Sequence, residues 1–170
     1  MSKAFTRESD FEDEDRPAPR LPANLPPGAK NYLTAQGARR LHDELDQLKD
    51  IERPRIAAAP DASESRLALQ RLDQRIRYLE ECLSSAEIVQ TQPGPVDRVR
   101  FGATVTVRDA KGLTTRYRIV GVDEADADRD WVSWRSPVAR ALLNQRVGQS
   151  IRLQLPEGEQ QLEIVEIFFE

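Results

Sequence analysis

The chain has 170 residues, of which 32% are charged and 39% hydrophobic, and its formal net charge is −4. That length allows one domain or two small ones, and the acidic balance argues against a general nucleic-acid coat protein, which would be strongly basic. Neither an apolar run long enough to span a membrane nor an apolar N-terminal signal is found. Because Cys82 is the single cysteine, no intrachain disulfide can form, and we expect a cytoplasmic protein.

Residues 1–30 are predicted to be a disordered acidic and proline-rich tail. An acidic cluster runs from Glu8 to Asp15, and five prolines follow between Pro17 and Pro27. Such a segment buries too little apolar surface to offset the entropy lost on ordering. We interpret it as a solvated tail. The alternative is an acidic tether that competes for basic surfaces.

Residues 31–90 carry the pattern of an antiparallel helical hairpin, with helices predicted over 34–59 and 65–87. Apolar side chains recur in both segments with the spacing of a coiled coil. They pair in mirror image: Leu41 with Leu83, Leu45 with Leu79, and Leu48 with Ile76. The pairs place the turn near Ala62. At about 1.5 Å per residue, each helix is expected to be roughly 35–40 Å long.

Local signals mark the helix ends and one irregularity. Thr34 is a good N-cap for the first helix, and Ser63 or Ser65 can cap the second. Pro54 has no backbone N–H and clashes with the preceding turn, which predicts a kink near residues 50–53.

After a predicted linker at 91–95, the hydrophobic period changes to two, which is typical of strands. Strands are predicted over 103–108, 114–122, 131–134, 151–155 and 162–169, with a polar loop over 123–130 and a short helix over 136–144. Residues 96–170 are therefore expected to form a small antiparallel sheet domain with one short helix. The predicted fold class of the whole chain is α+β.

The sequence offers few residues that could form a catalytic or cofactor site within this chain alone. His42 is the single histidine, so no His/Cys metal cluster and no catalytic triad is credible. The glycine pattern of a phosphate-binding loop is missing as well. We therefore expect no catalytic residues and no cofactor of the protein's own.

Two carboxylates, Asp61 and Glu64, lie three residues apart at the predicted hairpin tip. Such a pair suits a hard cation such as Mg²⁺, which accepts one or two protein carboxylates and keeps several waters. An exposed pair binds the ion weakly, so its use would be to complete a site supplied by another molecule. On composition alone, ordinary turn and helix-start residues are the favoured interpretation.

Behind the tip lies a group of arginines. They are Arg53, Arg55, Arg66, Arg71 and Arg75. Their guanidinium groups are suited to contact the phosphates of an RNA and guide its end toward the tip. A solvated coiled-coil flank with i,i+4 ion pairs explains them equally well.

Several motifs resemble the Gre transcript-cleavage factors. They are Arg75–Leu79, Phe101–Val105, Arg118–Gly121, and Ser136–Leu143 with Gly148. Two more, Asn31–Thr34 and Glu52–Pro54, are similar to the GreB branch in particular. The resemblance covers about residues 31–169, and its motifs are specific when taken together.

This resemblance implies a monomer that binds bacterial RNA polymerase. Its FKBP-like second domain would dock at the rim of the secondary channel, with Arg135, Ser136 and Pro137 as docking candidates. The coiled coil would thread the channel toward the nascent RNA 3′ end. Asp61 and Glu64 match the acidic pair that helps the polymerase hold its second Mg²⁺ and cleave backtracked RNA.

Two departures from the Gre pattern matter. The chain between Glu52–Pro54 and the tip is about seven residues shorter than in the family, and the returning segment about six, close to one heptad per arm. The tip then retreats by roughly 10 Å. In addition, Arg135 stands where the family tends to have an acidic or polar residue, a charge change that can weaken or redirect docking.

Three hypotheses follow from the sequence. The first is a polymerase-binding regulator with reduced or lost stimulation of transcript cleavage. The second is an active GreB-type cleavage activator in trans that uses Asp61 and Glu64 with the polymerase's Mg²⁺. The third is a Gre-derived binding module for a different protein.

Overall fold

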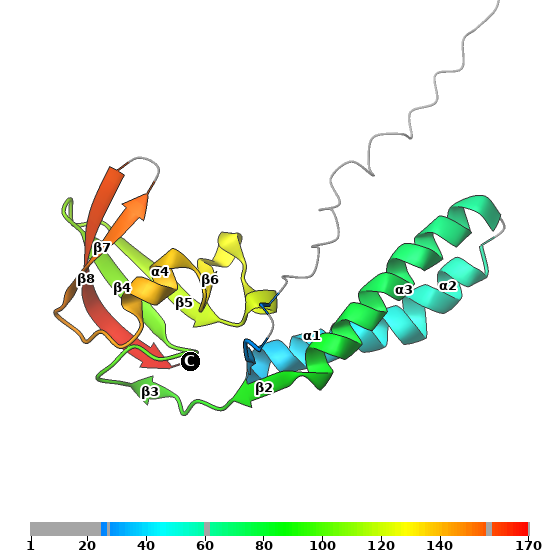
Figure 1. The fold of residues 1–170 in the computed structure, drawn as a ribbon, viewed down its shortest axis with the longest axis horizontal. Helices are drawn as coiled ribbons and strands as arrows, with labels where there is room; N and C mark the ends of the chain where they lie inside the picture. The colour runs from blue at the N-terminus through cyan, green and yellow to red at the C-terminus, as the bar shows by residue number, and fades with distance from the viewer. Residues whose placement is uncertain (1–24, 27, 60–61, 156–157, 170) are drawn as a thin grey trace, which may run out of the picture.

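The computed structural model describes residues 25–26, 28–59, 62–155 and 158–169. A two-helix arm projects from a sheet domain (Figure 1), which confirms the predicted α+β class. The tail prediction for residues 1–30 lies mostly outside these ranges. Within the described part of the chain, no helix has the length and apolar character needed to cross a membrane.

The arm begins at β1 (Asn31–Thr34) and α1 (Ala35–Gln47), and returns through α3 (Ala62–Ser84). Thr34 caps α1 as predicted, because its Oγ1 accepts a hydrogen bond of 2.9 Å from the backbone N–H of Gly37. The predicted apolar seam is the core of the arm. Its buried members are Leu41, Leu45, Leu72, Ile76 and Leu79, with Leu48, Ile56 and Leu83 partly buried against them.

The predicted irregularity before Pro54 takes the form of a π-helix, η1 (Leu48–Glu52), which is followed by α2 (Arg53–Ala57). The Arg53 N–H donates to the Leu48 carbonyl, five residues back. One extra residue in this turn shifts the apolar stripe. Ile51 is consequently 62% exposed, whereas Ile56 packs against the arm core.

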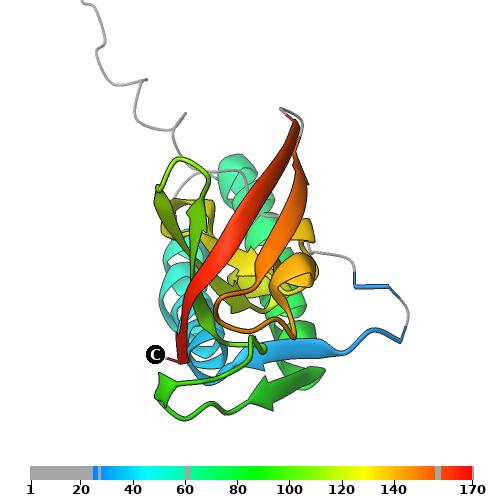
Figure 2. The ribbon, with the colours of Figure 1, turned by 90° about the vertical axis from the view of Figure 1, so that its left-hand side faces the viewer.

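The predicted ends of the second helix are wrong on both sides. α3 starts at Ala62, so both predicted caps, Ser63 and Ser65, lie inside the helix. α3 stops at Ser84, and β2 (Ala86–Val89) follows and pairs in parallel with β1. The two strands lie side by side at the base of the arm (Figure 2). Local pattern missed this pair because its partners are more than fifty residues apart in the chain.

Among the described residues, the sheet of the second domain has six strands. They are β3 (Gly94–Pro95), β4 (Thr104–Asp109), β5 (Thr114–Val120), β6 (Trp131–Ser133), β7 (Ser150–Leu155) and β8 (Gly158–Phe169). The order is β3-β8-β4-β5-β6, and β7 pairs with the first half of β8. β5 and β6 run parallel, so the expected all-antiparallel sheet is wrong at this pairing. The chain between them crosses over instead of turning back as a hairpin.

That crossover replaces the predicted polar loop over 123–130. It contains two short 3₁₀ turns, η2 (Val122–Glu124) and η3 (Ala127–Arg129). Glu124 is only 2% exposed, so the segment is not simply solvated. Its carboxylate faces the start of α1, as described below.

The domain core lies between the sheet and α4 (Pro137–Leu142). Its fully buried side chains are Val99, Ala103, Val105, Ile119, Ala139, Leu142 and Ile164. Ser136 caps α4 as predicted, since its Oγ accepts a hydrogen bond of 3.1 Å from the N–H of Ala139. Pro137 occupies the first turn, where its missing N–H costs nothing.

Candidate functional site

The two predicted regions of contact lie at opposite ends of the molecule. α3 begins at the far end of the arm, whereas α4 belongs to the sheet domain (Figure 1). Of the tip acids, Asp61 lies outside the described residues, and Glu64 is exposed in the first turn of α3. In the described part of the chain, no group of three or more His, Cys, Asp or Glu side chains is placed to hold a metal ion.

The five arginines behind the tip fall into two groups. Arg75 pairs with Glu44 through two hydrogen bonds of 2.7 and 3.0 Å across the arm. Arg53 pairs with Asp73 at 2.8 Å. These two side chains link the helices of the arm. The remaining members, Arg55, Arg66 and Arg71, are exposed.

The predicted docking residues lie in the connection between β6 and α4 and at the start of α4. Arg135 and Pro137 are exposed, and Ser136 is partly buried because its hydroxyl caps the helix. Beside them is a pocket of about 380 Å³, lined by Trp134, Arg135, Arg140 and Leu143. Two guanidinium groups therefore border an apolar surface at this edge.

Comparison with known proteins decides the family. The family description "Transcription elongation factor, GreA/GreB, C-term" matches residues 93–168. The transcription elongation factor GreB of Xanthomonas axonopodis pv. citri is 39% identical over 84% of this chain and 94% of its own length. The transcription elongation factor GreA of Alkalilimnicola ehrlichii is 39% identical over 82% of this chain and 98% of its own.

The chain belongs to the GreA/GreB family. It is GreB-like, and the resemblance inferred from its motifs is confirmed. Among solved structures, GreA factor homolog 1 of Thermus thermophilus is similar at 26% identity, over 82% of this chain and 99% of that one, with a TM-score of 0.37. The names of these curated relatives describe transcription elongation factors.

In this Gre-family chain, a buried carboxylate joins the arm to the sheet domain. Glu124 accepts hydrogen bonds of 2.9 Å from the backbone N–H groups of Thr34 and Gly121. The Thr34 hydroxyl donates to the other carboxylate oxygen of Glu124, Oε1. A Cβ at Gly37 would overlap the buried carboxylate of Glu124, which favours glycine at this position of α1. We call Thr34, Gly37, Gly121 and Glu124 the joint.

A second contact flanks the joint. The Tyr78 hydroxyl donates to Asp123 Oδ1, and the Cys82 thiol donates to Asp123 Oδ2 at 3.2 Å. Burial and the carboxylate of Asp123 raise the pKa of Tyr78 above its ordinary range. Burial, together with the same carboxylate, raises the pKa of Cys82 to about 11. Cys82 thus remains a protonated thiol at neutral pH, as expected for a structural residue rather than a nucleophile.

Sequence reasoning identified Thr34 as a helix cap but missed the contacts that make it part of the joint. Asp123 and Glu124 were assigned to a polar loop, although both contact the arm. Two glycines were the available signal. Gly121 directly follows a buried strand end and comes shortly before the acids Asp123 and Glu124, and Gly37 interrupts a good helix pattern. A glycine inside a helix usually has a packing reason, and here that reason is the Glu124 side chain.

Proposed function

We propose that this protein binds bacterial RNA polymerase at the secondary channel and modulates elongation and backtracking, with reduced or lost stimulation of transcript cleavage. It would act in the cytoplasm as a monomer, near the nascent RNA 3′ end. The observation that carries the proposal is the length of the arm. α3 has 23 residues, which corresponds to about 34 Å of helix.

In the Gre pattern that this chain resembles, the arm is longer than it is here. A tip about one heptad nearer the sheet domain moves its carboxylates back by roughly 10 Å. Ligand atoms must lie within about 0.2 Å of their proper distance from a metal. With docking at the same rim, Asp61 and Glu64 would therefore stop short of the Mg²⁺ that the polymerase holds.

The joint supports the proposal as well. An arm that swung freely about its base could compensate for lost length by changing its angle. Glu124 bonds both to Thr34 at the start of α1 and to Gly121 at the end of β5. Because these contacts are buried, changing the angle would expose or break them.

The alternative is an active GreB-type cleavage factor. One observation favours it: Asp61 and Glu64 have, in the sequence, the spacing of the acidic pair that the resemblance implies. Deeper docking through Arg135, Ser136 and Pro137 would then be needed to carry the pair to the metal.

A cleavage assay on backtracked complexes of purified polymerase tests the proposal. We expect the protein to bind the polymerase and to compete with a GreB of ordinary arm length. It should stimulate cleavage at least about tenfold less than that GreB, a difference of about 1.4 kcal/mol in barrier. Cleavage as strong as that of GreB, lost in the variant Asp61→Asn/Glu64→Gln, would overturn it and establish the alternative.

A matched pair of lengthened chains sharpens the assay. One heptad is inserted into each helix of the arm on the tip side of Pro54, which keeps the apolar seam in register. We expect this chain to gain cleavage stimulation. The same insertion carrying Asp61→Asn/Glu64→Gln should gain none, which would separate reach from tighter binding.

A further inference from the structure

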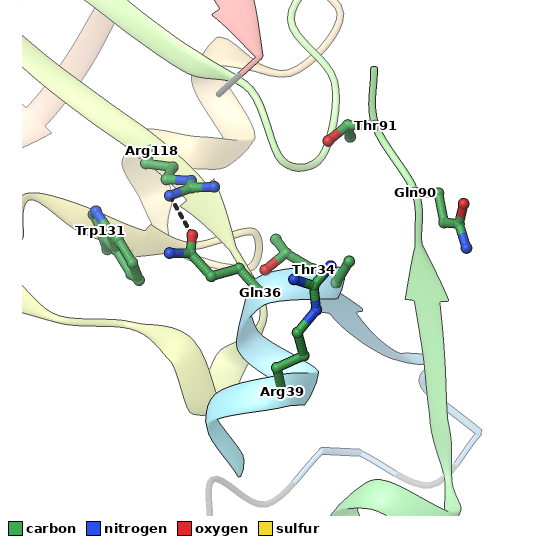
Figure 3. A pocket seen from close by; sticks show the side chains of 8 residues that line it. Thr34, Gln36, Arg39, Gln90, Thr91, Arg118 and Trp131 are labelled. Atoms are coloured by element: carbon green, nitrogen blue, oxygen red, sulfur yellow. Dashed lines mark hydrogen bonds between the residues drawn. The ribbon is translucent and has the colours of Figure 1, made fainter. Parts of the chain in front are cut away.

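A polar pocket of about 670 Å³ lies where three parts of the molecule meet. One wall is the start of α1, with Thr34, Gln36 and Arg39. A second is the chain leaving β2, with Gln90 and Thr91, and the third is the sheet, with Arg118 on β5 and Trp131 on β6 (Figure 3). It is distinct from the arm tip and from the docking residues at α4.

The pocket is positively charged. Arg118 is 9% exposed, and its Nη1 donates to Gln36 Oε1 at 3.0 Å. Arg39 approaches from the opposite wall and is exposed. None of the described residues that line the pocket is acidic. The nearby carboxylate of Glu124 is directed to Thr34 and Gly121, where it is hydrogen-bonded.

Trp131 carries an unusual concentration of guanidinium groups. Those of Arg40, Arg118 and Arg129 lie 4.7, 4.9 and 5.4 Å from its ring centre. Asp126 pairs with Arg129 at 3.5 Å.

We propose that this pocket binds a phosphate-bearing ligand of nucleotide size. Two guanidinium groups on facing walls suit the several oxygens of a phosphate. The amides of Gln36 and Gln90 and the hydroxyl of Thr91 add neutral hydrogen-bonding groups. An acidic side chain of a partner protein would fill only a small part of the volume, which falls within the range of small-molecule sites.

The fluorescence of Trp131 reports on this pocket. The chain has two tryptophans, so Trp134→Phe leaves Trp131 as the sole emitter, and Trp131→Phe leaves Trp134. Each variant is titrated with a nucleoside triphosphate, pyrophosphate or inorganic phosphate at constant ionic strength set with chloride. We expect a saturable change in the Trp131 signal, with the nucleoside triphosphate binding most tightly, and no change in the Trp134 signal.

Two arginine variants in the Trp134→Phe background test the assignment. Arg39→Gln removes an exposed pocket arginine and should raise the Kd at least about fivefold. Arg116→Gln removes an exposed arginine of the same strand as Arg118, one that stacks on Phe168, and should leave the Kd unchanged. Equal losses in both variants would mean non-specific charge attraction and would overturn the proposal.

Thermal unfolding of the wild-type chain gives a second measurement that needs no variant. At a ligand concentration of about 100 times Kd, we expect the nucleoside triphosphate to raise the Tm by roughly 5 °C or more. No saturable signal and no rise in Tm at millimolar concentrations would overturn the proposal. So would binding of an acidic peptide with the sequence of residues 8–15 in preference to all three phosphates.

Discussion

The base of the arm and its outer half are built differently. At the base, Leu33 and Leu79 are fully buried and Glu124 is 2% exposed. In the outer half, Ile51 and Leu67 are 62% and 52% exposed, and the ion pair of Arg53 with Asp73 lies at the surface. The direction of the arm is thus set by burial at one end. The reach of the arm depends on the number of helical residues beyond it.

The largest effect is expected at the joint. Glu124→Ala removes three hydrogen bonds and leaves the buried N–H groups of Thr34 and Gly121 without an acceptor. We expect the free energy of unfolding to fall by about 4 kcal/mol, as measured by urea denaturation. Glu166→Gln, on an exposed carboxylate of β8, is the control and should change it by no more than about 0.5 kcal/mol. Equal effects of the two changes would mean that Glu124 holds nothing in place.

The apolar seam should show the same contrast between base and outer half. Leu79→Ala creates a cavity in the arm core and should cost about 3 kcal/mol. Leu67→Ala deletes the same atoms from an exposed position of the same helix and should cost less than about 0.5 kcal/mol. Both values come from urea denaturation. A Leu67→Ala cost close to that of Leu79→Ala would show that the outer half is packed as firmly as the base.

A smaller effect is expected at Gly37. In most helices, Gly→Ala stabilises by about 1 kcal/mol. Here the new methyl group would collide with Glu124, so we expect Gly37→Ala to destabilise by about 2 kcal/mol. In a Glu124→Ala background the collision is removed, and Gly37→Ala should become neutral or stabilising. Additive effects in this double-mutant cycle would contradict the close approach of the two residues.

The smallest expected effect is a fall in the free energy of unfolding at alkaline pH. Because the pKa of Cys82 is raised to about 11 in the folded state, the folded protein keeps a proton that the unfolded chain loses near pH 8.5. This contribution is complete below about pH 8.5 and is lost as the pH rises toward 11. Tyr78, whose pKa is also raised, adds a loss in the same direction at higher pH.

Cys82→Ser isolates the thiol. Between pH 8 and about pH 9.5, the wild-type free energy of unfolding should fall by about 1 kcal/mol more than that of the variant. Urea denaturation at each pH measures the difference. Parallel curves for the two proteins would show that the thiol of Cys82 is not held by burial and Asp123.

The parts of the fold that depend on local chemistry could be predicted from the sequence. Thr34 and Ser136 were identified as helix caps because a hydroxyl before a helix has one typical use. The seam of the arm followed from apolar spacing, and Pro54 predicted an irregularity where the structure has the π-helix.

The features that the sequence did not predict depend on contacts between segments that are distant in the chain. β1 pairs with β2 across more than fifty residues, and Glu124 meets Thr34 across ninety. An acid in a loop is normally solvated, so no local rule places Glu124 inside the protein. The pocket was missed for the same reason, since Arg39, Gln90 and Arg118 converge only after the arm has docked on the sheet.

The central claim is that the arm is too short for its acids to reach the reacting centre of a partner. A structure of the full chain bound to a backtracked bacterial RNA polymerase tests it directly. We predict that the Glu64 carboxylate lies roughly 10 Å from the position needed to coordinate the catalytic Mg²⁺. A carboxylate oxygen of Asp61 or Glu64 at about 2.1 Å from that ion would contradict the account.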